Sequence, residues 1–324
     1  MIISRTPLRV SLVGGGTDTP AFYEKAPGAV VSFAISKYIY VSVNEKFDGT
    51  FRVSYSRTEN EATIDGIQHD LVRRALQTFR VVSGLEITSV ADIPGSGTGL
   101  GSSSSFTVGL VNALGHHLHK NNPKGGGLAE FAYDIEATGH PEIGKQDHYA
   151  AACGGLNLFR FNKKSVTIKP VEAEDSDLVE FEKHLVLLWT GITRPSSIPL
   201  RSQMRNFSAL DKTMKAGIEM AAYANELYRQ MQAGNFHMIG EYLHENWLLK
   251  KSISDAISNE KIDWLYEVAT KNGADGGKLC GAGGGGFLLF HCDPDARDRI
   301  AKATELRRVD FRIDTKGSDI IYEA

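Results

Sequence analysis

A segment rich in glycine and hydroxyl side chains, PGSGTGLGSSSS at residues 94–105, has the composition of an anion-binding loop. It follows a predicted strand at 85–92 and precedes a predicted helix that begins near Ser103. Glycines let backbone N–H groups approach an anion closely, and the positive end of the helix dipole adds to the attraction. No lysine follows the glycines, so the segment is not a GxxxxGK[ST] loop. The pattern predicts a phosphate-binding loop, and the alternative is a flexible turn with a serine N-cap.

Two further glycine-rich segments lie near the two ends of the chain. The first, VGGGTD at residues 13–18, places a hydroxyl and a carboxylate beside three glycines and could hold a polyol; the alternative is an Asx-type turn. The second, GAGGGG at residues 281–286, has GxGxxG spacing, but a predicted strand at 287–291 follows it in place of a helix. This second segment is predicted to be either a tight turn where chain segments cross or a close approach of backbone to a ligand.

Two carboxylates, Glu136 and Asp147, complete the set of residues with catalytic potential. Glu136 lies on a predicted helix at 128–138, and Asp147 opens the next helical stretch. Taken singly, Asp147 would be a helix N-cap and Glu136 a solvated helix residue. Beside a phosphate-binding loop, the two have the chemistry of a Mg²⁺ ligand and a general base.

The elements expected around these residues mix strands and helices without strict alternation. The first part of the chain is rich in predicted strands, at 8–13, 29–31, 39–43, 51–55 and 85–92. The second part combines predicted helices at 208–233, 236–257 and 296–306 with strands at 185–189, 287–291 and 310–315. This mixture favours an α+β fold over a doubly wound sheet. The acidic stretch at 172–182 is the expected boundary between an N-terminal domain at 1–178 and a C-terminal domain at 179–324.

Length, charge and cysteine content narrow the class of protein. A chain of 324 residues suits two domains of roughly 150 residues each. The net charge of −3 gives no basic excess for binding nucleic acid or an anionic membrane. The three cysteines lie far apart without a CxxC motif, and no signal peptide or membrane span is visible. We therefore expect a cytoplasmic protein that binds a small molecule, with neither a nucleic acid nor a membrane as partner; its oligomeric state is left open.

The three glycine-rich segments resemble, in type and order, those of the GHMP kinases, the family of galactokinase, homoserine kinase and mevalonate kinase. The stretches that carry the resemblance are PLRVSLVGGGTD at 7–18, PGSGTGLGSSSS at 94–105 and KLCGAGGGGFLLF at 278–290. Thr17 and Asp18 are similar to the Thr-Asp pair of the family's sugar kinases, whereas Gly15 and Gly16 replace their usual Glu-His. This departure, together with IGKQDHYAAACGGLN and WTGITRP, resembles the branch of heptose kinases and fucokinases.

The resemblance implies a two-domain fold with ATP and the substrate in the interdomain cleft. The loop that wraps the ATP phosphates would consist of Pro94, Gly95, Ser96, Gly97, Thr98, Gly99, Leu100, Gly101, Ser102 and Ser103. Ser103 and Glu136 would bind Mg²⁺, and Asp147, eleven residues after Glu136, would be the catalytic base. Arg9 would take the place of a lysine that steadies the base and the phosphates, with a fixed charge in place of a tunable one.

The branch also implies a sugar acceptor, most specifically a heptose 7-phosphate that is phosphorylated at its anomeric hydroxyl. The residues expected to contact the acceptor are Gly14, Gly15, Gly16, Thr17, Asp18, Gly283, Gly284 and Arg194. Arg194 is included because the segment TGITR combines small and hydroxyl residues with one guanidinium suited to phosphate; Lys145, Lys250 and Lys251 are the other candidates. Two alternatives stay open: a kinase of an unphosphorylated sugar such as fucose or galactose, and a non-catalytic sensor of ATP and sugar.

Overall fold

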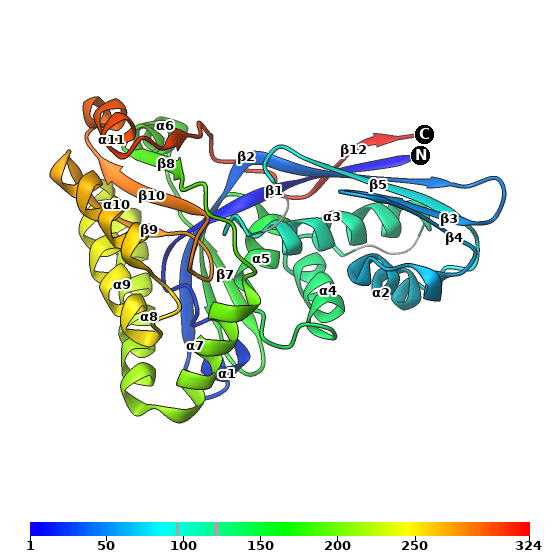
Figure 1. Cartoon of the computed structure of the whole chain (residues 1–324), viewed down its shortest axis with the longest axis horizontal. Coiled ribbons are helices and arrows are strands. Elements are labelled where there is room, and N and C mark those ends of the chain that lie inside the picture. Colours follow the sequence, from blue (N-terminus) through cyan, green and yellow to red (C-terminus); the bar gives the residue numbers. More distant parts are fainter. Residues whose placement is uncertain (95–96, 120–122) are drawn as a thin grey trace.

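Two β-sheets with helices packed on them form the protein, and the larger sheet contains both termini (Figure 1). The computed structural model describes residues 1–94, 97–119 and 123–324. The ends of the chain meet, because the amino group of Met1 donates to the carbonyl of Ala324 at 2.9 Å. Among the described residues, no helix combines the length and the apolar character needed to cross a membrane.

The larger sheet is organised around one long strand, β2, which spans Gly28–Glu45. One edge of β2 pairs with β1, and its other edge pairs first with β6 and then with β5. The described order is β12-β1-β2-β5-β3-β4, with β6 on β2 and β7 on β6. The other strands of this sheet are β1 Ile2–Val13, β3 Phe51–Ser54, β4 Thr58–Glu61, β5 Leu85–Ala91, β6 Leu156–Phe161, β7 Val166–Pro170 and β12 Asp319–Glu323.

One helix, α3 (Ser102–His117), lies against β1 and β2 and is buried over nearly its whole length. Gly109 allows the close contact, since a Cβ atom there would lie 2.8 Å from the Thr6 hydroxyl. Ser4 on β1 donates to the Gly109 carbonyl at 2.8 Å. In the first turn of α3, which follows the predicted phosphate loop, the Ser105 hydroxyl donates to the Pro7 carbonyl of β1 at 2.9 Å, so the start of the helix is held against β1 as well. The helices around α3 are α2 Asp70–Phe79, α4 Gly126–Ala137 and α5 Gln146–Cys153.

The smaller sheet lies in the C-terminal half of the chain and has the order β11-β8-β10-β9. Its described strands are β8 Leu185–Trp189, β9 Ala274–Leu279, β10 Phe287–Cys292 and β11 Arg307–Arg308. The helices of this half are α6 Asp175–Lys183, α7 Ser197–Ala209, α8 Asp211–Gln232, α9 Ile239–Ile253, α10 Glu260–Lys271 and α11 Arg297–Thr304. Short helical turns complete the described elements: α1 Pro20–Tyr23, η1 Ile64–Gly66, η2 Phe236–Met238 and η3 Pro294–Ala296.

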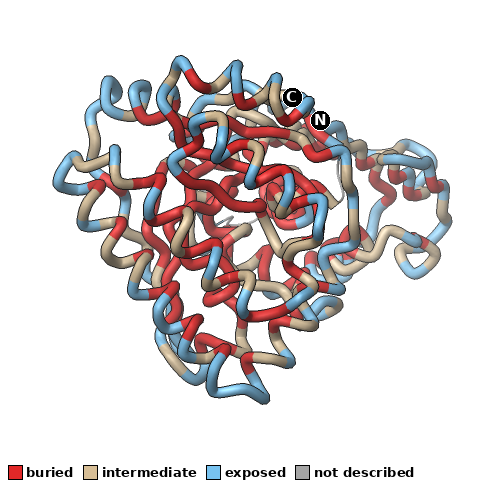
Figure 2. Tube along the Cα trace, turned by 60° about the vertical axis from the view of Figure 1, so that its left-hand side comes forward, coloured by how far each residue is buried: buried red, intermediate tan, exposed pale blue. Residues whose placement is uncertain are grey.

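The smaller sheet joins the two halves, because side chains of β8 and β10 point alternately into two hydrophobic cores. Leu187 and Leu289 belong to the core that is shared with β1, β2 and α3. Leu188 and Phe290 belong to the core under α9, α10 and α11. Figure 2 shows the buried chain running through the middle of the molecule, with exposed residues on its outer turns and helix faces. The halves are therefore packed together, and the junction between them is a continuous interior.

The fold confirms the expected α+β class and corrects several of its elements. The strands predicted at 29–31 and 39–43 form the single strand β2. The helix predicted at 208–233 corresponds to α8, which begins three residues later because the backbone of Leu210 is extended; the preceding helix α7 was not predicted. The strand predicted at 310–315 is wrong, since only Ile313 makes an isolated bridge, to Ile35.

The end of the chain returns to the larger sheet. β12 pairs antiparallel with β1, although its residues fall within the C-terminal domain proposed at 179–324. The acidic stretch expected to mark the boundary contains α6, which leads directly into β8. A division near residue 178 therefore separates the strands of the two sheets, with the one exception of β12 among the described strands. The limits of the two domains at this residue stay a proposal.

Candidate active site

A cavity of about 790 Å³ opens where the two halves meet. Its N-terminal wall comes from β1, the loop before α3, and helices α4 and α5. Its C-terminal wall comes from the segment at 194–203, from α9 and from the turn after β9. The predicted site residues that line it are Arg9, Gly16, Asp18, Gly97, Thr98, Gly99, Gly101, Ser102, Ser103, Glu136, Asp147, Arg194 and Gly283. The expected cleft between the halves is thus present, and it contains most of the predicted residues.

The predicted phosphate loop forms one wall of this cavity and is fixed to β1. Gly97, Gly99 and Gly101 all have positive φ, between 71° and 77°, a conformation that L side chains rarely adopt. The Leu100 carbonyl accepts the backbone N–H of Arg9 at 3.0 Å. The residue before α3 is Gly101, and no side chain caps the helix, so the alternative of a turn with a serine N-cap is wrong. Pro94 is exposed, and Gly95 and Ser96 lie outside the described residues.

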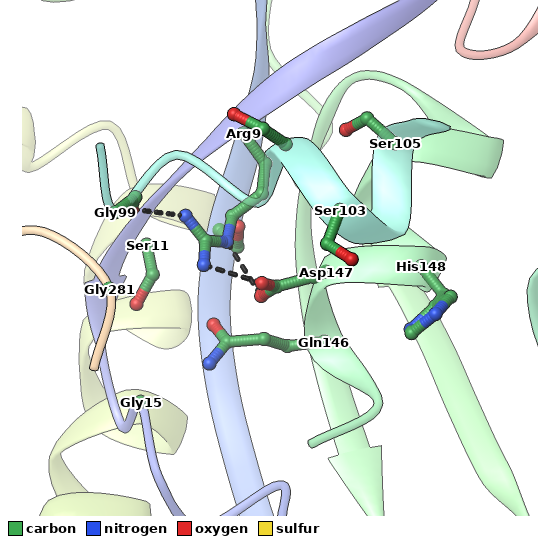
Figure 3. A network of polar contacts seen from close by, with 12 residues as sticks. Arg9, Ser11, Gly15, Gly99, Ser103, Ser105, Gln146, Asp147, His148 and Gly281 are labelled. Carbon is green, nitrogen blue, oxygen red and sulfur yellow. Dashed lines mark hydrogen bonds and ion pairs between the residues drawn. The ribbon is translucent and has the colours of Figure 1, made fainter. Parts of the chain in front are cut away.

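Arg9 and Asp147 form a two-pronged ion pair in the middle of the site (Figure 3). The Nε and Nη2 atoms of Arg9 each donate to one oxygen of Asp147 at 2.7 Å. The remaining Nη1 atom donates to the Gly99 carbonyl at 2.7 Å, which ties the base candidate to the loop. Each carboxylate oxygen can accept more than one hydrogen bond, so Asp147, which is 23% exposed, can still accept a hydroxyl from the cavity. The pair therefore holds one carboxylate at a fixed place beside the loop.

The position of Asp147 is set by Asp18, which lies 129 positions earlier. Asp18 is 2% exposed, and its oxygens accept the backbone N–H and the side-chain amide of Gln146 at 3.1 Å each, and the Gly16 N–H at 2.9 Å. Gln146 is the first residue of α5, so Asp18 supplies the cap that this helix lacks locally. Burial and the nearby charge of Asp147 raise the pKa of Asp18. Asp147 itself bonds Arg9, so its interpretation as a helix N-cap is wrong.

Ser103 and Glu136 meet at a second point on the cavity wall. The Ser103 hydroxyl donates to Oε1 of Glu136 at 2.6 Å, while Thr107 and His148 contact Oε2 at 3.2 and 2.7 Å. Burial alone would raise the pKa of Glu136, but His148 and the two hydroxyls more than offset it, and the pKa is lowered. Glu136 is therefore an ionised, buried carboxylate and not a solvated helix residue.

This pair fits the chemistry of a magnesium site. A hydroxyl and a carboxylate are the hard oxygen donors that Mg²⁺ prefers. The described residues contain no cluster of three or more metal-ligating side chains, so the other ligands of the ion would be phosphate oxygens and water. Such a division of ligands is usual where Mg²⁺ accompanies a nucleotide.

The first glycine segment is bound to its surroundings mostly through its backbone. The Gly14 N–H donates to the Asn246 side chain at 2.9 Å, which links the segment to α9. The Thr17 hydroxyl donates to the Gly14 and Ala29 carbonyls at 2.8 and 3.1 Å, so it is used inside the loop. Of the five residues predicted here, Gly16 and Asp18 line the cavity, whereas Gly14, Gly15 and Thr17 lie behind its wall.

The third glycine segment packs backbone against backbone on the phosphate loop. A Cβ atom on Gly281 would lie 2.5 Å from the Cα of Gly99, and one on Gly286 would lie 2.3 Å from the Thr98 carbonyl oxygen. At these positions the structure favours the tight crossing turn. Gly283 lines the cavity, and Gly284 lies under Arg194, since a Cβ there would be 2.4 Å from its Nη1. The segment thus shapes the cavity and joins it to the C-terminal half.

The four cations proposed for an acceptor phosphate have different environments. Arg194 lines the cavity, and among the described residues its guanidinium has no hydrogen bond or ion pair. Lys145 pairs with Glu130, and Lys251 pairs with Asp263 at 3.1 Å; neither lines the cavity. Lys250 is 3% exposed and does line it. Only Arg194 and Lys250 of these four therefore face the cavity.

Sequence reasoning did not predict the buried positions of three residues near the site. His148 is fully buried against Glu136, yet in the sequence it is only the residue after Asp147. Lys278 opens the third segment and is also fully buried. Lys250 sits next to Lys251 near the end of a helix, where two lysines are usually solvated. The one available signal was that Lys278 opens a run of apolar residues and glycines, up to Phe290, that contains no other charged residue.

Comparisons with known proteins agree with this geometry. The models of the GHMP kinases N terminal domain and the GHMP kinases C terminal match residues 69–155 and 227–305. The chain is 32% identical over 318 residues to D-glycero-alpha-D-manno-heptose 7-phosphate kinase of Campylobacter jejuni, covering 93% of this chain and 92% of the relative. It is 27% identical to mevalonate kinase of Methanothermobacter thermautotrophicus, over 84% and 86% of the two chains. A crystal structure of a D-glycero-D-manno-heptose 1-phosphate kinase from Bacteroides thetaiotaomicron superimposes with a TM-score of 0.80 over both whole chains, at 23% identity.

The fold and the site, with a glycine loop at a helix N-terminus and a fixed carboxylate beside it on the wall of the interdomain cavity, define a small-molecule kinase. The chain belongs to the GHMP kinase family, since both family models match it and a family member is 32% identical over most of its length.

Proposed function

We propose that this enzyme transfers the γ-phosphoryl group of ATP to the anomeric hydroxyl of a D-glycero-D-manno-heptose 7-phosphate. The observation that carries the proposal is the composition of the cavity wall, which holds the glycine loop, the Asp147 carboxylate and the guanidinium of Arg194, for which the described residues supply no hydrogen bond or ion pair. A phosphorylated acceptor needs a cation for its own phosphate, and we assign Arg194 to it; the Arg194 backbone packs on the loop, since a Cβ atom on Gly97 would lie 2.8 Å from its nitrogen. The relative from Campylobacter jejuni supports the heptose phosphate as the acceptor.

The nucleotide would occupy the side of the cavity that the N-terminal half forms. Backbone N–H groups of the glycine loop and the first turn of α3 would bind the phosphates. Mg²⁺ bound by Ser103 and Glu136 would neutralise phosphate charge. Tyr55, His69 and Phe106 line the same cavity. The ring centroid of His69 lies 4.6 Å from that of Tyr55 and 5.0 Å from that of Phe106, and such an aromatic cluster suits a purine base.

The acceptor would lie between Asp147 and the C-terminal wall. In an in-line transfer the sugar oxygen bonds to the γ-phosphorus while the bond from phosphorus to the ADP oxygen breaks. The hydroxyl proton passes to Asp147 late in the step, because the transition state of such transfers is loose. Arg9 keeps the Asp147 carboxylate oriented and opposes its charge through both prongs of the ion pair. We further propose that the enzyme works in the cytoplasm, where a nucleotide-dependent kinase finds ATP.

The direct test is a screen of the purified protein for ATP consumption with sugars and sugar phosphates. Heptose 7-phosphate is expected to give the highest kcat/KM, and ³¹P NMR of the product should place the new phosphate on the anomeric carbon. Fucose or galactose as the preferred acceptor would replace the proposal with a kinase of unphosphorylated sugars. Saturable ATP and sugar binding without turnover would instead indicate a sensor.

Replacing Arg194 with alanine tests the acceptor end of the site. We expect the KM for heptose 7-phosphate to rise about 10-fold to 100-fold, since a charge-assisted hydrogen bond to phosphate is lost, with the KM for ATP nearly unchanged. Arg201→Ala is the matched control, because Arg201 lies on the neighbouring helix and pairs with Glu142 while its side chain is 68% exposed. Equal KM values in wild type and Arg194→Ala would contradict the assignment.

A further inference from the structure

Two lysines from the C-terminal half are buried at the junction with the N-terminal half. Lys250, on α9, is 3% exposed, and its Nζ atom donates to the carbonyls of Gly15 and Gly281 at 3.2 and 3.0 Å. Lys278, on β9, is fully buried, and its Nζ atom donates to the backbone and side-chain oxygens of Ser11 at 2.8 and 3.2 Å. Neither ammonium group has an ion pair among the described residues.

The Lys250 ammonium has no carboxylate of its own among the described residues. The carboxylates whose charges act on it are Asp18 and Asp147. Asp147 is already paired with Arg9, and Asp18 is bonded by N–H groups of its own half. A buried cation without a counter-charge costs free energy, and an anion that enters the cavity would lower that cost. The surroundings of Lys250 are therefore suited to an anionic ligand.

Of the two lysines, only Lys250 lines the cavity. An ammonium group has three N–H donors, and the two carbonyls use two of those on Lys250. Burial lowers the pKa of Lys250 to about 8, with the attraction of Asp18 acting in the opposite sense, so the group is mostly protonated at neutral pH. Its third donor thus stays available to a ligand in the cavity.

The place of Lys250 relative to the reacting groups can be followed from its neighbours. Gly281, whose carbonyl it contacts, packs on Gly99 of the phosphate loop. A Cβ atom on Gly15, its other contact, would lie 3.5 Å from both the Lys250 ammonium and the side-chain amide of Gln146, the residue before Asp147. Figure 3 shows Gly15 and Gln146 below the Arg9–Asp147 pair and Gly281 to its left. The Lys250 ammonium, which contacts Gly15 and Gly281, therefore lies near this pair, and the charges of both Arg9 and Asp147 act on it.

We propose that Lys250 is a ligand of the phosphoryl group in transit, donating its third N–H to a non-bridging oxygen of that group between donor and acceptor. The inference rests on the proposed function as a kinase, and it goes beyond it by assigning a cation from the C-terminal half to the transferred group. Lys250 forms no covalent bond and keeps its proton, while the hydroxyl proton goes to Asp147.

The test compares Lys250→Met and Lys250→Gln with Lys278→Met. Both Lys250 variants are expected to lower kcat about 100-fold, the loss typical of removing one donor to a transition-state oxygen. By calorimetry with Mg²⁺, both should bind AMPPNP about tenfold more weakly than the wild type while ADP binding stays unchanged, since only AMPPNP carries a γ-phosphoryl group. Lys278→Met removes an equally buried lysine that does not reach the cavity, and it should preserve kcat and both affinities.

Three results would overturn the inference: an unchanged kcat in the Lys250 variants, an unchanged ratio of AMPPNP to ADP affinity, or an equal loss in Lys278→Met. Lys250→Gln keeps N–H donors for the two carbonyls, so it decides the question if the methionine variant does not fold. The nucleotide affinities need no acceptor. A wild type that phosphorylates no sugar phosphate would therefore defeat the proposed function while the γ-phosphoryl contact is still tested on its own.

Discussion

Replacing Asp147 with asparagine is expected to lower kcat by about 10²–10⁴, the range of general acid–base groups. Asparagine keeps the shape of the side chain and one acceptor for Arg9, but it cannot take the hydroxyl proton. It also leaves the buried guanidinium of Arg9 without its counter-charge, so we expect the free energy of unfolding to fall by about 2 kcal/mol. Steady-state kinetics and urea denaturation of the same preparation measure the two effects separately.

Asp263→Asn is the matched control for this prediction. It removes a carboxylate from the ion pair with Lys251, outside the cavity, and is expected to change kcat less than twofold. A variant Asp147→Asn that loses stability but keeps the specific activity of its folded fraction would show that Asp147 only anchors Arg9. The proposed base would then have to be sought elsewhere in the cavity.

Ser103→Ala and Glu136→Gln are expected to have the second largest effect, on the dependence of the reaction on magnesium. Each removes one of the two oxygen ligands that the chain would offer, so the Mg²⁺ concentration for half-maximal rate should rise about tenfold and kcat should fall about 10-fold to 1000-fold. Titration of the initial rate with Mg²⁺ at fixed ATP measures both quantities. Unchanged titration curves in both variants would exclude this pair as the metal site.

Thr107→Val is the control that distinguishes loss of a metal ligand from a general disturbance of the Glu136 carboxylate. The Thr107 hydroxyl contacts the same carboxylate, at 3.2 Å, but it is fully buried and does not line the cavity. Its loss should cost about 1 kcal/mol of stability, as a single hydrogen bond does, and leave the half-maximal Mg²⁺ concentration within a factor of two. A shift as large as that of Ser103→Ala would mean that the variants act by disturbing Glu136.

Local sequence patterns were enough to predict the glycine loop and the elements beside it. Gly97, Gly99 and Gly101 adopt the positive φ angles that alternate glycines permit, and α3 begins within one residue of the predicted start. These features depend on backbone sterics and on the apolar pattern of neighbouring residues, both of which are properties of a short stretch of chain. The family resemblance added the expectation that Arg9 steadies the proposed base Asp147. In the structure the two side chains form an ion pair.

Elements whose stability depends on distant partners were predicted poorly. β9 contains Gly276 and Gly277 and has the composition of a turn; the structure needs glycine there because a Cβ on Gly276 would lie 1.9 Å from the Gly240 carbonyl oxygen on α9. β12 exists through its pairing with β1, at the opposite end of the chain. Neither the packing of a helix on a strand nor a pairing over 300 residues leaves a periodic signal in the sequence.

The sequence by itself predicted the kind of chemistry: a loop with the composition for binding phosphate, two carboxylates at a fixed spacing and a cationic residue on the first strand. The tertiary structure alone decided how these charges are used. It turned Asp18 into the cap of α5, buried Lys250 and Lys278 at the junction of the halves, and placed Arg194 on the cavity wall without a partner in the part of the chain that the structure describes. The physical reason is that local spacing selects backbone conformation, whereas burial and Coulomb energy depend on which groups meet in space. A lysine beside another lysine on a helix is the same in sequence whether it faces water or a phosphoryl group.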